Sequence, residues 1–448
     1  MGKFLLACHQ FFPRFYTGTE TLTLEVAEEL RRLGHDVAIL TTEPILPGDT
    51  VPEKVECREE SVRGITVWKL VIPEVHDPIK RLESESNDPS IEQHVSAIIN
   101  SWKPDIVHCF HLMRLTQTFA KVVKQHRIPF CLTVTDFWVM CPTYQLIKYN
   151  NKLCSGPSDT KCFSCLIDAY TKGMAKVPVK FKVAKRLPRI ASRVNTGANS
   201  SIKSLGVRIN RHKDFFGMID GVVWSNPFIQ SIFHDNKFQN KNEYIIPFPI
   251  PEQSRGTVNL PLAKKDGVLK VAFIGTLRPS KGPQILLQAA RHLKDETNIE
   301  YYIWGAAENE KFEMTLKELS GNSSQIHYCG VFPQEKFADV LRDIHVVVIP
   351  SIWYENTPLT ALSVLAAKRI LVVSDLGGLS SLVESGTSGY TFPAGDYKAL
   401  ADTIKHISDN RHLIHEISTH IKEPLNIARY VQEMQTSLWR EVKMGAAH

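Results

Sequence analysis

The fold of this chain is decided by the stretch Pro350-Ser351-Ile352-Trp353-Tyr354-Glu355-Asn356-Thr357-Pro358-Leu359. An apolar run, Val346 to Ile349, precedes it, and an Ala-rich apolar run, Leu359 to Ala367, follows it. This pattern predicts a strand, a short loop and the start of a helix. In an open α/β sheet, ligands bind outside the carboxyl ends of strands, where a helix N-terminus offers N–H groups to an anion. Glu355 would lie beside that anion site and suits a ligand's hydroxyls better than its phosphates. The stretch therefore predicts a nucleotide-sugar pocket, and the alternative is a helix-capping Glu on an ordinary βα loop.

The bulk properties indicate a globular protein of more than one domain. At 448 residues the chain is too long for a single core, so two domains are expected. The net charge of +6 is mild, and no run reaches the length of a transmembrane helix. The apolar run Lys3 to Cys8 is too short for a signal-peptide core, so we expect a cytoplasmic location. Nine cysteines in such a chain argue against a disulfide framework.

Strands alternate with helices along nearly the whole chain, which is typical of parallel βαβ units. Pattern and composition predict two such series, separated by a polar, Pro-containing stretch that starts at Pro247. We therefore expect an α/β fold of two doubly wound Rossmann-like domains that face a cleft. The expected parts are an N-terminal domain of residues 1–250, a linker at 251–267, a C-terminal domain of residues 268–420, and a helix within 421–448 that could pack back on the N-terminal domain.

Several motifs in a fixed order point to a known family. The N-terminal ones are Gly18-Thr19-Glu20, Asp105-Ile106-Val107-His108 and Thr133-Val134-Thr135-Asp136-Phe137-Trp138. The C-terminal ones are Phe273-Ile274-Gly275-Thr276-Leu277 with Lys281-Gly282, then Pro350–Leu359, Gly377-Gly378 and Gly386-Thr387-Ser388-Gly389. Together they resemble the retaining glycosyltransferases of family 4, which have the GT-B fold, over nearly the whole chain. The resemblance is to members that build bacterial polysaccharides or lipid-linked glycans.

The resemblance implies roles for individual residues. Gly18 would let the backbone approach a phosphate closely, and the alternative is a simple loop-to-helix glycine. Lys281 would neutralise a diphosphate and Arg278 could share that role, and the alternative for both is a solvated loop charge. The implied catalytic residues are Glu355, Asp136 and Lys281. The implied donor-binding residues are Gly18, Thr276, Arg278, Lys281, Asn356, Thr357, Pro358, Leu359 and Ser363. His111 and Asp136 would lie on the acceptor side.

The chain also departs from the family pattern at positions that bear on activity. Thr276 stands where the family has an Arg, and Ser363 replaces the second carboxylate of the Glu-x7-Glu pair. Ser381 replaces the Glu of the Gly-Gly-x-x-Glu motif, and Thr135 replaces the His that contacts the donor sugar. His108 or His111 could compensate for the missing His, although a structural histidine is the alternative for each. No Asp-x-Asp metal motif is present, so no catalytic metal is expected.

A cluster of cysteines follows the Asp136 motif. Cys141, Cys154, Cys162 and Cys165 have the spacing C-x12-C-x7-C-x2-C, inside an expected loop rich in Gly, Pro, Ser and Asp. This spacing is typical of a closed tetrahedral zinc site, whose metal would supply the energy that orders a segment poor in apolar residues. An iron–sulfur cluster and four unliganded thiols are the alternatives.

The segment from Ala169 to Lys213 is basic. It holds twelve Lys or Arg residues and no Asp or Glu, with apolar residues interleaved. Such a segment suits an anionic membrane surface or a lipid diphosphate acceptor, and the alternative is a solvated helix face. Nucleic acid is not expected as a partner, because no aromatic platform or helix-turn-helix pattern accompanies the charge.

The sequence as a whole predicts a glycosyltransferase on the cytoplasmic face of a membrane. It would move a sugar from a nucleotide-sugar donor to a glycan or lipid-linked acceptor, with retention. Two alternatives stay open: a degenerate homologue that binds a nucleotide sugar without turnover, and a nucleotide-sugar epimerase on the same fold.

Overall fold

The computed structural model describes residues 1–73, 75, 83–84, 87–148, 152–171, 179–190, 196–252, 254 and 267–446. The chain forms two compact units. The first consists of Met1–Asn150, Cys154–Ile246 and Ala428–His448, and the second of Asn151–Leu153 and Pro247–Ile427. The expected linker at 251–267 falls almost entirely outside the described residues.

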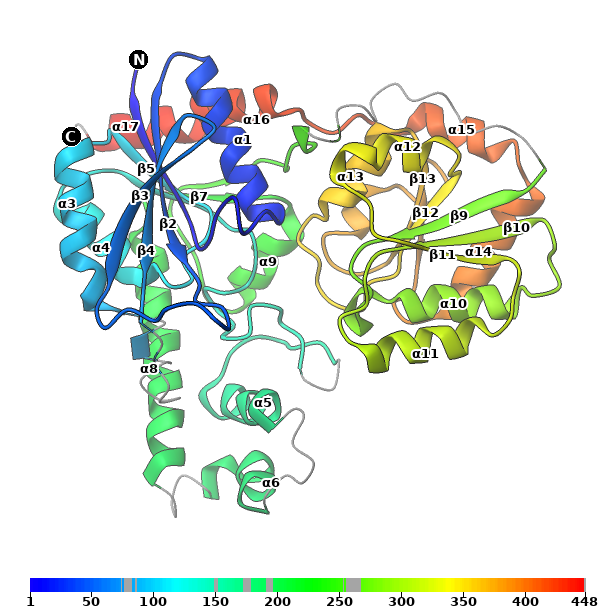
Figure 1. The fold of residues 1–448 in the computed structure, drawn as a ribbon, viewed down its shortest axis with the longest axis horizontal. Helices are drawn as coiled ribbons and strands as arrows, with labels where there is room; N and C mark the ends of the chain where they lie inside the picture. The colour runs from blue at the N-terminus through cyan, green and yellow to red at the C-terminus, as the bar shows by residue number, and fades with distance from the viewer. Residues whose placement is uncertain are drawn as a thin grey trace. The chain divides into compact units, whose positions relative to one another are not determined.

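The first unit is built on an eight-stranded sheet with the order β3-β4-β2-β1-β5-β6-β7-β8 (Figure 1). All neighbouring strands are parallel except β3, which is antiparallel to β4. The strands are β1 Lys3–Cys8, β2 Asp36–Glu43, β3 Glu56–Val62, β4 Ile65–Val71, β5 Ile106–Cys109, β6 Phe130–Thr133, β7 Gly221–Trp224 and β8 Glu243–Ile245. The central strands are continuous apolar runs because helices cover both faces of the sheet.

The helices of the first unit connect these strands. They are α1 Gly18–Arg32, α3 Glu92–Trp102, α4 Thr116–Gln125, α5 Asp159–Thr171, α6 Val179–Arg186, α8 Thr196–Met218 and α9 Pro227–Asp235. Strand β1 lies between β2 and β5, so the loops after β1 and β5 lead to opposite sides of the sheet. Such a switch point leaves a crevice at the carboxyl ends of the two strands.

The second unit repeats this plan with a six-stranded parallel sheet of order β11-β10-β9-β12-β13-β14. The strands are β9 Leu269–Ile274, β10 Ile299–Trp304, β11 Ile326–Gly330, β12 Val346–Ile349, β13 Ile370–Ser374 and β14 Tyr390–Phe392. The helices are α10 Pro283–His292, α11 Glu310–Ser320, α12 Phe337–Arg342, α13 Leu359–Ala366, α14 Tyr397–Asp409 and α15 Leu413–His420. Its switch point lies between β9 and β12, where the decisive stretch of the sequence begins.

The C-terminal segment packs on the first unit. The pattern predicts one helix over Leu425–Val442, but the structure has α16 Ile427–Met434, a π-helical turn at Gln435–Trp439 and α17 Arg440–Ala446. Trp439 Nε1 donates a hydrogen bond of 2.9 Å to His108 Nδ1 in β5. A Cβ on Gly221 of β7 would lie 2.3 Å from Leu438 Cδ1, so a larger residue there would make the Leu438 side chain shift.

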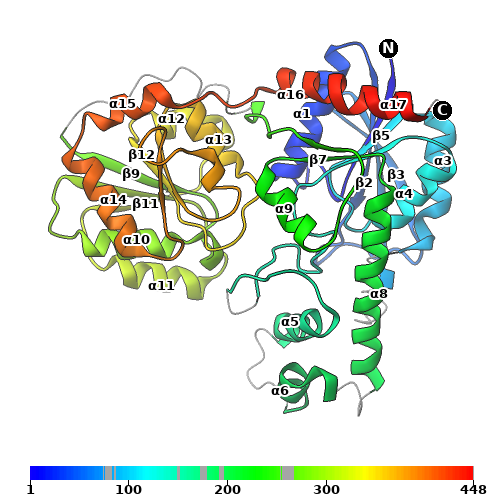
Figure 2. The same ribbon diagram turned by 180° about the vertical axis from the view of Figure 1, so that it is seen from behind.

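Helices α5, α6 and α8 form an arm that extends beyond the first sheet (Figures 1 and 2). The sequence predicts a loop for the cysteine-rich insert 141–165, whereas the structure places Cys162 and Cys165 in α5. Ser158 accounts for this helix, because its Oγ accepts the Lys161 N–H at 3.2 Å as an N-terminal cap. A small core between α5 and α8 holds the arm together; it consists of Cys162, Phe163, Ile167, Ala198, Ile202 and Leu205.

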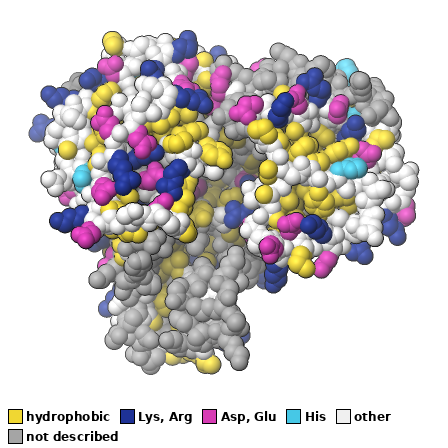
Figure 3. All heavy atoms as spheres, viewed as in Figure 1, with side chains coloured by type: hydrophobic (Ala, Val, Ile, Leu, Met, Phe, Trp, Pro, Cys, Tyr) yellow, Lys and Arg dark blue, Asp and Glu magenta, His cyan; other side chains and the backbone are white. Residues whose placement is uncertain are grey.

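The surface of the described residues carries mixed charge. On the face drawn in Figure 3, basic and acidic side chains of each unit are interspersed. None of the described helices combines the length and the apolar composition that a membrane-spanning segment needs.

Candidate active site

A cation and a carboxylate meet at the switch point of the second unit. Lys281 follows β9, Glu355 follows β12, and Lys281 Nζ lies 2.6 Å from Glu355 Oε1. Ser351 Oγ and Trp353 Nε1 each donate to the same oxygen at 2.8 Å. The Lys281 ammonium also lies 5.4 Å from the centroid of the Trp353 ring, which favours a cation–π contact. Glu355 is 5% exposed, so this carboxylate is held in one position.

The backbone brings these two loops together. Gly282 has a φ of +76°, and a Cβ there would lie 1.9 Å from the Pro350 carbonyl oxygen. Only glycine therefore allows the loop after β9 to touch the end of β12. Ile352 N donates to Ser280 O at 2.9 Å and completes the contact. The sequence predicts Lys281 and Glu355 as site residues. It does not predict that their side chains form an ion pair, or that Ser351 and Trp353 donate hydrogen bonds to Glu355.

The other predicted donor-binding residues take different positions around this pair. Thr276 is exposed just after β9, and Arg278 Nε lies 3.7 Å from Glu308 Oε2. Ser363 is buried, and its hydroxyl donates to Leu359 O at 3.1 Å within α13. Asn356, Thr357, Pro358 and Leu359 are half-buried and lead from Glu355 into the first turn of α13.

A second polar group lies at the carboxyl ends of β5 and β6 in the first unit. His111 Nε2 lies 2.8 Å from Asp136 Oδ2. Because His111 Nδ1 accepts the Met113 N–H at 3.1 Å, the Nε2 of a neutral ring carries the proton and donates it to Asp136. Asp136 Oδ1 accepts the Trp138 N–H at 2.8 Å. The His111 side chain is buried, whereas the Asp136 side chain is 31% exposed and faces solvent.

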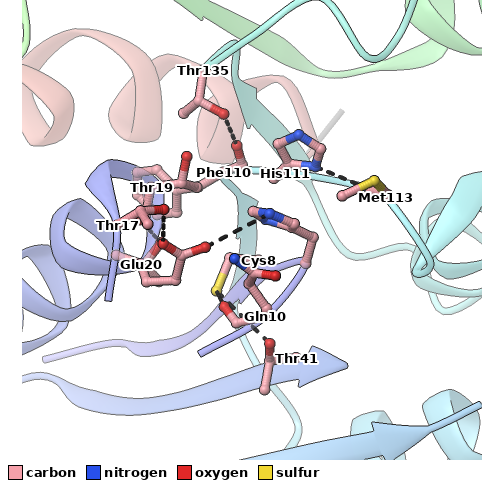
Figure 4. Close-up of polar contacts among 12 residues, drawn as sticks. Cys8, Gln10, Thr17, Thr19, Glu20, Thr41, Phe110, His111, Met113 and Thr135 are labelled. Carbon is pink, nitrogen blue, oxygen red and sulfur yellow. Dashed lines mark hydrogen bonds and ion pairs between the residues drawn. The ribbon is translucent and has the colours of Figure 1, made fainter. Parts of the chain in front are cut away.

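His9 and Glu20, which the sequence does not predict as site residues, also belong to this group. The ring of His9, just after β1, lies 4.1 Å from the ring of His111. His9 Nε2 lies 3.6 Å from Oε1 of Glu20, which is fully buried, and Thr17 Oγ1 donates to Glu20 Oε2 at 2.5 Å. Figure 4 shows Thr17 and Glu20 at the start of α1, with His111 and Thr135 on neighbouring strand ends. Burial, with smaller effects of His111 and Arg114, lowers the pKa of His9 well below its ordinary value, so the ring is neutral.

The sequence contained only a weak signal for these two residues. Glu20 belongs to the Gly18-Thr19-Glu20 motif, whose glycine alone was given a role; Gly18 is exposed and is the first residue of α1. His9 is a lone histidine after a strand, a pattern that buried structural histidines share. His108 is such a histidine, because it is fully buried between Thr133 and Trp439 and burial lowers its pKa to about 3. Thr135, which replaces the family histidine, donates to Phe110 O at 2.8 Å.

The four clustered cysteines line one small cavity of about 20 Å³ in the arm. Burial, with smaller contributions from the three other cysteines nearby, raises the pKa of the Cys162 thiol to about 12. Among the residues that the structure describes, no group of three or more His, Cys, Asp or Glu side chains is already arranged as a metal site.

Comparisons with known protein families match both halves of the chain. Residues 17–153 match the model of the glycosyl transferase 4-like domain, and residues 260–423 match that of the glycosyl transferases group 1. The chain is 30% identical over 167 residues to the D-inositol 3-phosphate glycosyltransferase of Corynebacterium efficiens, a match that covers 36% of this chain and 38% of that protein. The corresponding protein of Mycolicibacterium smegmatis is 29% identical over 163 residues, which is 35% of this chain and 36% of that protein. The chain thus spans well under half the length of the curated relatives it matches.

Solved structures resemble nearly the whole chain in fold. Sucrose-phosphate synthase from Thermosynechococcus elongatus has a TM-score of 0.60 and 16% identity, over 100% of this chain and 98% of that one. Anabaena HepE in complex with UDP and glucose has a TM-score of 0.61 and 13% identity, over 98% and 99%. A glycosyltransferase from Rickettsia africae has a TM-score of 0.63 and 14% identity, over 98% of each chain. The chain therefore carries a glycosyltransferase 4-like domain followed by a group 1 glycosyltransferase domain, and it has the GT-B fold of two Rossmann-like units.

Proposed function

We propose that this protein transfers a sugar from a nucleotide-sugar donor to a glycan or lipid-linked acceptor, with retention and without a catalytic metal. The observation that carries the proposal is the Lys281–Glu355 pair at the switch point of the group 1 domain. A fixed cation beside a buried carboxylate matches a donor that has a diphosphate at one end and sugar hydroxyls at the other. Similar folds have been solved with UDP or a UDP-sugar bound, including HepE and a trehalose-6-phosphate protein of E. coli, which supports this class of donor.

Lys281 and Glu355 can each still form hydrogen bonds with the donor. A lysine ammonium has three N–H donors, and the contact with Glu355 uses one of them. The others can bind diphosphate oxygens, so Lys281 would supply the positive charge that a metal supplies in other transferases. The three hydrogen bonds to Glu355 all end on Oε1, and Oε2 can accept a bond from a sugar hydroxyl. The leaving diphosphate would then act as the base toward the acceptor while Lys281 stabilises its charge.

The first unit would hold the acceptor. Asp136 is the exposed member of its polar group, and His111 and the Trp138 N–H fix the orientation of its carboxylate. A carboxylate fixed in this way can accept a hydrogen bond from the acceptor hydroxyl that attacks the sugar. Asp136 is therefore a candidate catalytic residue, and His111 is a positioning residue.

Helix α6 supports an acceptor that resides at a membrane. Val179 and Val183 of α6 are exposed at 73% and 46%, and Leu187 and Ile190, just beyond the end of the helix, are exposed at 49% and 50%. Exposed Lys182 and Arg186 flank this stripe, and Lys185 pairs with Asp168 of α5. An apolar stripe bordered by cations suits an anionic bilayer at the inner face of a membrane.

Replacing Lys182 and Arg186 by Ser should abolish binding to acidic vesicles, whereas the same change at Lys311 and Lys317 on α11 should not. Vesicle binding that does not depend on the charge of the lipid would contradict a membrane-docking role for this stripe.

The whole proposal is tested by a screen of common nucleotide sugars. The purified protein should gain thermal stability with one of them, and should release its nucleoside diphosphate when a glycan or lipid-linked acceptor is added, in a buffer without added Mg²⁺ or Mn²⁺. A change of the donor sugar without any acceptor would identify an epimerase. Binding without release would identify a non-catalytic homologue. The comparisons give no support to either alternative.

A further inference from the structure

The four cysteines of the insert come from the loop after β6, from the segment that follows it and from α5. Cys141 lies in the loop after β6, and Cys154 is tied to the same region because its N–H donates to Leu146 O at 2.8 Å. Cys162 and Cys165 are three residues apart on α5, so their side chains leave the same face of the helix. All four line one cavity of about 20 Å³, which has room for about one water-sized body.

The chemistry of this cavity suits a soft divalent cation. Two thiols one helical turn apart can chelate a metal, and two more thiols complete the four ligands of a closed zinc site. Two of the thiols have weak partners: Cys141 Sγ lies 3.3 Å from Thr143 Oγ1, and Cys154 Sγ lies 3.4 Å from Gly156 O. The sulfurs surround the cavity without being gathered at coordinating distance. A metal would therefore draw them inward and displace their protons, because thiolates are the ligands.

The arm has a small core of its own. Among the described residues, six buried side chains join α5 to α8, and one of them is Cys162 itself. Small cores are commonly supplemented by a metal or by disulfides. None of the nine cysteines forms a disulfide in this structure, so a metal is the available cross-link.

We propose that Cys141, Cys154, Cys162 and Cys165 bind one Zn²⁺ as four thiolates and that this ion fixes the arm to the loop that carries Asp136. Four thiol protons leave as the four Zn–S bonds form, and no electron is transferred. The consequence for Asp136 rests on the function proposed above, whereas the metal site itself does not.

The structure links the cysteine cavity to Asp136 through a short path. Cys141 N donates to Phe137 O at 2.7 Å, one residue beyond Asp136. On α8, Arg208 donates to Trp138 O at 2.7 Å, and His212 Nδ1 donates to Val139 O at 2.6 Å. The loop that carries Asp136 is thus held by the cysteine cluster at Cys141 and by α8 at Trp138 and Val139. Loss of the metal should loosen Asp136 and leave the Lys281–Glu355 pair, in the other unit, intact.

Metal analysis of the full-length protein tests the site directly. We expect about one zinc per chain. A mercurial reagent should release this zinc in proportion to its reaction with the four thiols. Cobalt in place of zinc should give the visible spectrum of a tetrahedral tetrathiolate. Cys165→Ser should lose the zinc, whereas Cys57→Ser, a matched change at an exposed cysteine of the same unit, should keep it. Iron with acid-labile sulfide, or four freely titrating thiols without metal, would overturn the proposal.

A second measurement covers the case in which Cys165→Ser does not fold. Wild-type protein treated with a strong chelator should lose its zinc and become sensitive to proteolysis in the arm, and zinc should restore resistance. If the function proposed above also holds, chelation should raise the KM for the acceptor and leave nucleoside diphosphate affinity unchanged. Unchanged proteolysis after complete zinc loss would show that the metal does not hold the arm.

Discussion

The two switch points of this chain have the same backbone plan and opposite chemistry. In the second unit, the loops after β9 and β12 bring a lysine and a glutamate together as an ion pair. In the first unit, the loops after β1 and β5 bring two histidine rings together, and His9 is held neutral. The first site holds the partly exposed Asp136 carboxylate, which binds hydroxyls, and the Arg114 guanidinium, which donates to His9 O at 2.7 Å. The second site offers a lysine that attracts phosphate. On the function proposed above, the donor would bind to the second unit and the acceptor hydroxyl to the first.

The largest effect is expected at the carboxylate of the second site. Glu355→Gln keeps the shape of the side chain and can still accept from Ser351 and Trp353, but it removes the ion pair with Lys281. Transfer should fall by about 100-fold to 1,000-fold, the loss typical of one preorganised transition-state contact. Nucleoside diphosphate affinity by calorimetry should change little. Glu313→Gln, an exposed position on α11, is the matched control, and wild-type activity in Glu355→Gln would remove this residue from the mechanism.

The neutral histidines of the first unit should make its stability depend on pH. His9, His108 and His212 stay neutral in the folded chain, whereas unfolded histidines take up protons near pH 6.5. The unfolded state therefore binds more protons as the pH falls through 6.5, and stability is lost in that direction. At pH 5.5 the three residues together should cost roughly 4 kcal/mol relative to pH 8. Urea unfolding at both pH values measures this, and His9→Gln should remove about a third of the difference. An unaltered pH dependence in that variant would mean that His9 is not neutral in the fold.

Removing the cation tests the other half of the comparison. Lys281→Ala should weaken nucleoside diphosphate binding by about 1.5–3 kcal/mol, which is roughly tenfold to a hundredfold. It also leaves the buried Glu355 without its positive partner, so the melting temperature should fall. Calorimetry and thermal melting separate the two effects, with Lys311→Ala as the control. Undiminished diphosphate affinity would place the donor elsewhere.

The smallest effect is expected at the first site. Asp136→Asn keeps the side chain's size but weakens a charge-assisted contact to the acceptor hydroxyl, so the acceptor KM should rise about tenfold. The donor KM should stay constant, because the donor is assigned to the other unit. Initial rates with each substrate varied in turn measure both constants, and Asp235→Asn on α9 serves as the control. A rise in the donor KM alone would reverse the assignment of the two sites.

The fold was largely predictable because its strands are continuous apolar runs that alternate with amphipathic helices. The stretch after β12 and the lysine after β9 could be placed at one sheet edge by the switch-point rule. The direct contact between them could not, because it depends on Gly282 passing against the Pro350 carbonyl, a tertiary close approach. His9 and Glu20 were missed for a similar reason: a buried polar residue has no pattern of its own in sequence.

Two local errors have more specific causes. The composition predicts a loop where α5 forms because Gly, Pro and Ser dominate its neighbours, although Ser158 followed by Asp159 is a helix-start signal. The pattern predicts a continuous C-terminal helix because the π-helical turn at Gln435–Trp439 keeps an apolar face.

The return of the C-terminal segment has a consequence for how the protein is made. A ribosome synthesises the first unit's sheet early, and domains generally fold in that order. Here the core around His108 and β7 acquires its last partners, Trp439 and Leu438, only after the whole second unit has been translated. The nascent first unit therefore exposes apolar surface while the second unit is made, and a chain that stops before Leu438 would lack these partners in the domain that is made first.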